Sequence, residues 1–270
     1  MGTRKPRSAR VLPAEGGWAR RLARLAVALS VGAVAAALIA AIGSGQGAWH
    51  FRTGFAVLRY AFFAGIAGGL LAVAAIILMR DRPSVRRRWS ILLALFLGFG
   101  LAGYIGNQYV TARSLPAIHD ITTDLDDMPE YSALAVRPDN LDNVPDEGRP
   151  ELAAMTPEER WKTLHREAYG DLKTISVPWS VAETIGRAQA VAEKKGWEIV
   201  HVDPSRGRLE ATDTSLFFRF KDDVVVRARR DPERKGRTIV DLRSISRVGG
   251  SDVGVNARRI REYLKDLKQS

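Results

Sequence analysis

Three apolar segments occupy the first 110 residues of the chain, at residues 25–42, 60–79 and 89–109. Each has close to the roughly 20 apolar residues that an α-helix needs to cross the hydrocarbon core of a bilayer. No acid or histidine interrupts them, so the buried ionisable groups typical of proton or ion paths are missing. The pattern predicts a three-helix transmembrane region over residues 25–110.

The basic residues around these segments are distributed unevenly. Twelve of the fourteen lie in the N-terminal tail or the second loop, and only Arg52 and Arg59 lie in the first loop. The twelve are Arg4, Lys5, Arg7, Arg10, Arg20, Arg21, Arg24, Arg80, Arg82, Arg86, Arg87 and Arg88. By the positive-inside rule, residues 1–24 form a basic cytoplasmic tail, and an odd number of spans places everything after residue 110 outside. The Ala- and Arg-rich composition is typical of bacteria, so we expect an inner-membrane protein with a periplasmic C-terminal part.

Two features of the membrane region leave alternatives open. The first segment could be a cleaved signal peptide, but its apolar run of about 18 residues exceeds the 7–15 usual there, which favours a retained helix. Small residues also recur at four-residue spacing, as at Gly65 and Gly69. Such stripes allow close helix packing, either between copies of the chain or, as we favour, among its own three helices.

The pattern changes beyond residue 110. Residues 111–155 are rich in Asp, Pro and Asn without a period, which predicts an acidic irregular connector. Residues 156–270 predict a folded domain with two capping boxes, one starting at Thr156 before a helix that ends at Gly170, and one starting at Ser180 before a helix that ends at Gly196. Strands are expected at residues 174–177, 197–202, 209–220, 224–230 and 237–247.

A final amphipathic helix completes the domain, with Ser251 or Asp252 as its expected N-cap. The order after the first helix is β-α-β-β-β-β-α, which favours an α+β fold with an antiparallel sheet and helices on one face. Alternation along the strand at 224–230 places Val224 and Val226 toward the helices and Val225 and Arg227 away from them.

The charge is also divided between the two parts. The formal net charge of +11 comes from the membrane region, because residues 111–270 hold 27 basic and 28 acidic residues. A nucleic-acid footprint would need basic clustering in the folded domain, so we expect no nucleic-acid partner. The chain contains no cysteine, which excludes disulfides, thiolate metal sites and cysteine nucleophiles.

Three segments of the outer part resemble a catalogued family. They are His119-Asp120-Ile121-Thr122-Thr123-Asp124, the aromatic run at residues 217–220 with the strand that follows it, and the block from Asp241 to Ile260 that contains Arg247-Val248-Gly249-Gly250-Ser251-Asp252. Together they are similar to a bacterial family known only as domain of unknown function 1499, over roughly residues 115–268. The resemblance implies no activity, substrate or cofactor.

The block between the last strand and the last helix is the first candidate site. Its glycine pair frees the backbone ahead of a helix N-terminus, where an anionic head group or phosphate could bind. The candidate ligand-binding residues are Arg243, Ser246, Arg247, Ser251, Asp252 and Asn256. The alternative is structural, with glycines forming the turn and Ser251 or Asp252 capping the helix.

The acidic segment after the membrane region is the second candidate. His119, Asp120 and Asp124, with Asp126 and Asp127 close behind, could bind a hard cation such as Ca²⁺ through oxygen ligands. The spacing matches no twelve-residue calcium loop, and Asp side chains that cap turns are the structural alternative. The sequence predicts no cofactor.

Nucleophilic catalysis has weak sequence support. The glycine–serine elbow of hydrolases is absent, because the glycine after Ser251 arrives one position late, at Gly254. His165 and His201 are expected to be packing or surface residues. We therefore expect a non-catalytic envelope binding or assembly module, with the lipid bilayer, an anionic lipid or envelope ligand, or a membrane protein as partner. An envelope hydrolase and a purely structural subunit of a membrane complex are the alternatives.

Overall fold

The computed structural model describes residues 17–78 and 85–270 of the chain. Much of the predicted basic tail and part of the basic second loop, including Arg80 and Arg82, lie outside these residues. The chain divides into two compact units, Met1–Gly106 and Asn107–Ser270.

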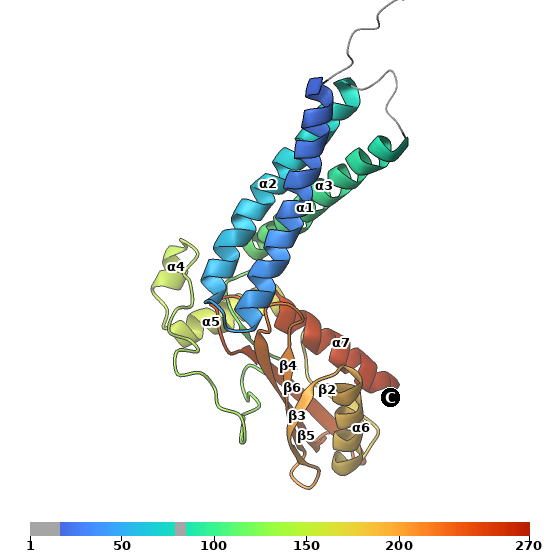
Figure 1. The fold of residues 1–270 in the computed structure, drawn as a ribbon. Coiled ribbons are helices and arrows are strands. Elements are labelled where there is room, and N and C mark those ends of the chain that lie inside the picture. Colours follow the sequence, from blue (N-terminus) through green and yellow to red (C-terminus); the bar gives the residue numbers. More distant parts are fainter. Residues whose placement is uncertain (1–16, 79–84) are drawn as a thin grey trace, which may run out of the picture. The chain divides into compact units, whose positions relative to one another are not determined.

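The first unit consists of long apolar helices, as the sequence predicts. They are α1 (Gly17–Gly45), α2 (Phe51–Leu78) and α3 (Val85–Ser114) (Figure 1). The last turns of α3, from Asn107, belong to the second unit. All three are long and apolar enough to cross a membrane. Large apolar side chains such as Phe96 and Ile77 are exposed on the outside of these helices, as expected for surfaces that face lipid.

Small residues bring the three helices together. A Cβ atom added to Gly98 in α3 would lie 2.5 Å from the carbonyl oxygen of Gly65 in α2 and 2.8 Å from Oγ of Ser30 in α1. A Cβ atom at Gly68 would likewise collide with Ser30. The glycines therefore permit a close helix approach within one copy of the chain, as expected for small residues in membrane helices.

The second unit is an α+β domain built on an antiparallel sheet of six strands. Its strands are β1 (Asp120–Thr122), β2 (Ile175–Val177), β3 (Glu198–Asp203), β4 (Arg208–Thr214), β5 (Lys221–Arg230) and β6 (Thr238–Ser246). The strand order is β1-β6-β5-β4-β3. β2 also pairs with β6, along residues 238–240, whereas β1 pairs along residues 243–245. The predicted fold class is confirmed.

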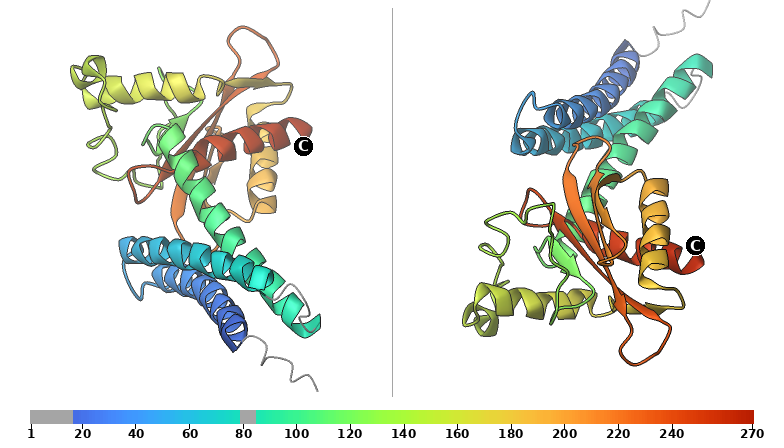
Figure 2. Two further views of the ribbon diagram at one scale, coloured as in Figure 1. Left: turned by 90° about the horizontal axis from the view of Figure 1, so that it is seen from above. Right: turned by 90° about the horizontal axis from the view of Figure 1, so that it is seen from below.

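Four helices accompany the sheet: α4 (Pro150–Ala153), α5 (Pro157–Tyr169), α6 (Val181–Lys194) and α7 (Val255–Gln269). Both predicted helices begin as expected, since the Thr156 and Ser180 side chains accept hydrogen bonds from the backbone N–H groups of Glu159 and Glu183. The reciprocal bond of a capping box forms at Glu159, whereas the Glu183 carboxylate binds Arg187. Helices α6 and α7 pack on one face of the sheet, over a core that includes Val224 (Figures 1 and 2).

Helix α5 lies beside the edge of β1. The indole Nε1 of Trp161 donates to the carbonyl oxygen of Asp120 at 2.9 Å, and the backbone N–H of Thr122 donates to Nε2 of His165 at 3.1 Å. Both side chains are buried. The helix therefore satisfies backbone groups of β1 that a further strand would otherwise have to pair.

The structure differs from the sequence prediction in three places. Strand β1 and the short helix α4 lie within residues 111–155, which were expected to be irregular. Residues 215–220 form a turn rather than a strand, closed by hydrogen bonds between Ser215 and Phe220. The sheet face opposite the helices is partly covered, because Tyr131 donates to the carbonyl oxygen of Asp223 and the 132–134 backbone donates to Glu210. Val225 on that face is buried.

Candidate functional site

The two predicted candidate sites meet at one internal ion pair. Arg243 on β6 and Asp120 on β1 are 7% and 1% exposed, and they form two hydrogen bonds of 3.0 and 2.7 Å. Asn140 donates to the same carboxylate at 2.6 Å. Burial opposes the charge of Arg243, but the hydrogen bonds and charge of Asp120 outweigh it and raise its pKa. Asp120, which was predicted to bind a cation, thus neutralises Arg243, which was predicted to bind an anionic ligand.

A second buried network lies on the helix-covered side of β6. The Asn256 side chain accepts a hydrogen bond from Ser244 at 2.7 Å, and its amide contacts Ser246 at 3.0 Å and the His119 carbonyl oxygen at 2.9 Å. Arg259 joins the network through the same amide oxygen. Ser246 and Asn256 therefore connect β6, β1 and α7 inside the domain rather than facing a cavity.

Arg259 also binds two carboxylates. Its guanidinium contacts Asp213 at 2.8 Å and Asp222 at 2.6 Å while its side chain is 8% exposed. No role was predicted for Arg259. Its position next to Ile260, on the apolar side of the last helix, could nevertheless be seen in the sequence.

The loop before α7 supports the structural alternative for its candidate residues. Asp252 accepts the backbone N–H groups of Gly254 and Asn256 at 2.9 and 2.7 Å, and Ser251 accepts that of Val253 at 3.2 Å. Burial raises the pKa of Asp252 despite these hydrogen bonds. The helix N-cap is Gly254, with φ of 73°, rather than the expected Ser251 or Asp252.

Arg247 is the most accessible of the predicted ligand-binding residues. Its side chain is 41% exposed, yet its guanidinium binds both carboxylate oxygens of Asp223 at 2.8 Å and contacts Thr212 at 3.2 Å. The hydrogen bond to Asp223 is the main reason that its pKa is raised. A ligand would have to compete with this bidentate pair.

The three candidate metal ligands each have their own protein environment. Asp120 binds Arg243, and Asp124 accepts the backbone N–H groups of Asp126 and Asp127 at 3.1 and 3.0 Å, which is the turn-capping role. His119 is buried, and burial together with the charge of Arg137 lowers its pKa. Among residues 17–78 and 85–270 no group of three or more His, Cys, Asp or Glu side chains is arranged to hold a metal ion.

The sheet face opposite the helices carries a further cluster of charges. Arg227 and Arg229 both bind Asp241, at 3.2 and 3.0 Å, and both bind Asp127. Asp241 has no solvent exposure. These arginines, which the alternation of β5 places on one face, are held to the 124–127 segment instead of forming a free basic surface.

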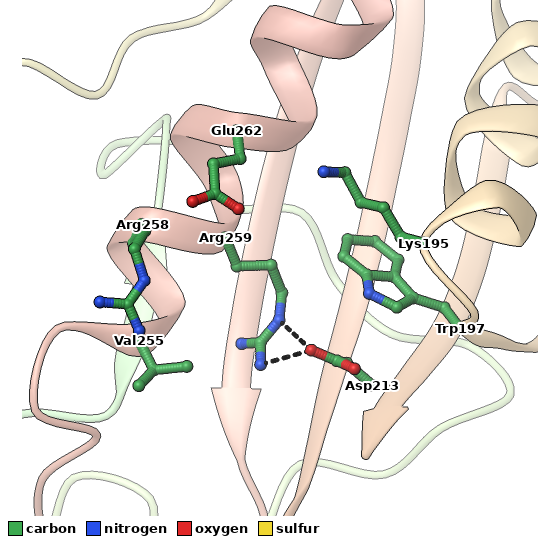
Figure 3. A pocket seen from close by; sticks show the side chains of 7 residues that line it. All are labelled: Lys195, Trp197, Asp213, Val255, Arg258, Arg259 and Glu262. Carbon is green, nitrogen blue, oxygen red and sulfur yellow. Dashed lines mark hydrogen bonds and ion pairs between the residues drawn. The ribbon is translucent and has the colours of Figure 1, made fainter. Parts of the chain in front are cut away.

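A pocket of about 290 Å³ lies between α7 and the start of β3 (Figure 3). In this view Arg259 points toward Asp213, while Lys195 and Trp197 lie on the other side of the space from Arg258 and Val255. Glu262 completes the lining. The charges are mixed, so the pocket has no clear preference for an anion or a cation.

A groove of about 720 Å³ lies at the opposite end of the sheet. It is bounded by the start of α6, by the turn after β3 and by the hairpin between β5 and β6. Its lining includes Arg230, Lys235 and Arg237 with Asp231 as the single acid. Residues 231–236 separate the strands expected at 224–230 and 237–247, and no binding role was predicted for them, although the basic residues around this connection could be seen in the sequence. Neither Arg243 nor Arg247 borders this groove or the smaller pocket.

The geometry of a serine hydrolase is not assembled in residues 107–270. No serine hydroxyl there is hydrogen-bonded to a histidine. His165 is buried against β1, where burial lowers its pKa to about 4. The arrangement needed for a nucleophile and its base therefore gives no support to Ser251 or Ser246 as a nucleophile.

These features define a class of protein: three helices able to cross a membrane, followed by an α+β domain with buried arginine–carboxylate pairs. Residues 120–267 match the sequence profile of the protein family of unknown function DUF1499, and the chain belongs to that family. The match includes the segments on which the resemblance rested, except for His119 at the start of the first one. No curated protein matches the chain.

Proposed function

We propose that this protein is a non-catalytic binding module of the bacterial cell envelope, anchored in the inner membrane with its α+β domain in the periplasm. The three apolar helices support the membrane anchor. The uneven distribution of basic residues around them supports a cytoplasmic N-terminal tail and a periplasmic domain. A tethered domain gains a high effective concentration near the membrane surface, which benefits a binding function.

The proposed ligand is an anionic envelope component, and the groove beside α6 carries this proposal. Its volume of about 720 Å³ lies within the roughly 300–1,000 Å³ of typical small-molecule sites. Arg230 and Lys235 form no ion pair among the described residues, and both are exposed. Asp231, in contrast, is engaged by Ser176 at 2.7 Å and by two backbone N–H groups. The groove therefore has an excess of positive charge.

Two further features suit phosphate or carboxylate groups. Arg237 is held in place by hydrogen bonds of 2.9 and 2.8 Å to Ser176, so little conformational freedom remains to be lost on binding. Val181 and Ala182, in the first turn of α6, line the groove. Helix N-termini favour anions because their first N–H groups lack intrahelical partners.

Two neighbouring residues of the hairpin provide a matched test. Lys235 lines the groove, whereas Arg234 is exposed beside it and does not. Lys235→Glu and Arg234→Glu change the net charge equally. We would extract each full-length variant gently from its own membrane and compare it with the parent protein by native mass spectrometry.

A bound anionic molecule that is lost from Lys235→Glu and retained by Arg234→Glu is the expected result. Retention by both variants, or equal loss from both, would place binding elsewhere and contradict the groove. A parent protein with no bound molecule but a stoichiometric protein partner would contradict the binding module and favour a structural subunit.

A further inference from the structure

The turn between β4 and β5 exposes large apolar side chains. Leu216 is 77% exposed and Phe217 is 48% exposed. The turn has a defined conformation, because Ser215 and Phe220 close it through two hydrogen bonds and the rings of Phe218 and Phe220 stack with centroids 5.1 Å apart. We call residues 215–220 the apolar tip. Exposed apolar side chains on a fixed turn indicate a contact surface.

The apolar tip lies at the end of the sheet where the chain enters the domain from α3. Lys221 follows the tip, and its carbonyl oxygen accepts a hydrogen bond from the backbone N–H of Arg247 at 3.0 Å. The backbone N–H of Ser246, the residue before Arg247, donates to the carbonyl oxygen of His119 at 3.2 Å. These contacts place the base of the tip two strands away from β1, which is about 10 Å at the usual strand spacing.

The connection from α3 to that end of the sheet is short. The last residues of α3, up to Ser114, belong to the same compact unit as the sheet. The carbonyl oxygen of Ile118, only four positions after the helix end, already accepts a hydrogen bond from the backbone N–H of Asp252. Four extended residues span at most about 14 Å. The helix that ends there is one of the three able to cross a membrane. With the proposed membrane placement, the short connection keeps this end of the sheet near the bilayer surface.

The charge of this end complements an anionic lipid surface. Residues 214–221 and 246–251 contain no acid, and they contain Arg219, Lys221 and Arg247. Arg219 is exposed and forms no ion pair among the described residues, while Lys221 and Arg247 contact Glu198 and Asp223. Val248, in the loop after β6, is 42% exposed and extends the apolar surface.

We infer that the apolar tip docks on the lipid bilayer that anchors the chain, with Leu216 and Phe217 in the interfacial layer and Arg219 among anionic head groups. Aromatic and leucine side chains flanked by basic residues are the usual composition of segments that lie in the membrane interface. The inference rests on the proposed membrane placement and is independent of the groove. The short connection favours lipid over a protein occupant, because the tip cannot move far from the bilayer.

The absence of cysteine from the chain allows a site-specific test in the full-length protein. Leu216→Cys would be labelled with an environment-sensitive fluorophore and placed in nanodiscs of phosphatidylcholine and phosphatidylglycerol that contain nitroxide-bearing lipids. The matched control is Glu233→Cys, an exposed position in the hairpin at the other end of β5. Phe96→Cys in α3, an exposed position of the apolar helix, reports whether the chain enters the bilayer.

The expected result is loss of most fluorescence at position 216, little loss at position 233, and strong quenching at position 96. Adding Phe217→Ser to Leu216→Cys should reduce the quenching at 216, as should nanodiscs of phosphatidylcholine alone. Quenching at 96 without quenching at 216 would overturn the docking while leaving the membrane placement intact. A label at 216 that is shielded from water but not quenched would show that a protein or a second copy covers the tip. No quenching at 96 would overturn the membrane placement itself and the docking with it.

Discussion

Removing the Asp120 carboxylate should destabilise the domain far more than removing a comparable carboxylate at the surface. Asp120→Ala leaves the Arg243 guanidinium, which is 7% exposed, without its charged partner. Breaking a buried pair in this way costs about 3–5 kcal/mol, a large part of the roughly 5–15 kcal/mol that stabilises a typical domain. With a urea slope of about 2 kcal/mol per M, the midpoint of unfolding should fall by about 2 M.

The matched control is the exposed pair of Arg261 and Asp171. It is also bidentate, with contacts of 2.6 and 2.7 Å, but its side chains are 43% and 56% exposed. Asp171→Ala should therefore cost only about 0–1 kcal/mol. Urea unfolding of the full-length variants in nanodiscs, followed by tryptophan fluorescence, measures both.

A double substitution separates charge burial from lost packing. Asp120→Ala with Arg243→Met removes both charges, so it should be less destabilising than Asp120→Ala alone. Equal midpoints for Asp120→Ala and Asp171→Ala would refute the view that burial makes the first pair structural. A double variant no more stable than Asp120→Ala would show that the orphaned charge is not the source of the loss.

Three further outcomes follow from the geometry. Burial lowers the pKa of His165 to about 4, so the unfolded chain takes up a proton first and stability should fall by about 3 kcal/mol between pH 6.5 and pH 4; in His165→Gln the urea midpoint should lose that part of its pH dependence. Gly207→Ala should destabilise more than Gly236→Ala, because φ is positive at both positions but only at Gly207 would the new Cβ overlap a β5 carbonyl oxygen; thermal unfolding measures the difference. Gly98→Leu should disrupt helix packing in the membrane unit, whereas Gly100→Leu, with open space around it, should not, as limited proteolysis in nanodiscs would show.

The elements that were predicted correctly depend on local signals. The capping boxes at Thr156 and Ser180 and the apolar spacing of the last helix are visible within a few residues, and all three helices form. The three apolar helices are equally local, since length and composition define them. Elements of this kind need no knowledge of what they contact.

The misassigned segments depend on distant partners. Strand β1 has three residues and pairs with β6, whose Arg243 is 123 positions away from Asp120. No local period marks such a strand. Residues 215–220 are a separate, local case: their composition is strand-like, but two hydrogen bonds between Ser215 and Phe220 close a turn.

The candidate site shows the same limit. Arg243 and Asp120 were each recognised as residues with possible ligands, because a lone arginine or aspartate in a sequence carries no record of its partner. The structure joins them to each other. The basic residues of the groove, Arg230, Lys235 and Arg237, become one surface only when the hairpin meets the start of α6. Tertiary contacts decide which charges remain available.

The pairing of the first strand with the last has a consequence for biogenesis. β1 follows the apolar helices directly, whereas β6, the strand that pairs with it, comes much later in the chain, since Arg243 is 123 positions after Asp120. Such non-local pairing folds slowly because a long loop must close first. Until β6 has been synthesised, β1 and the Asp120 carboxylate lack their partners, and such incompletely folded chains are prone to aggregate. The domain can complete its sheet only after β6 has been synthesised, so truncation before β6 should give unfolded, protease-sensitive products.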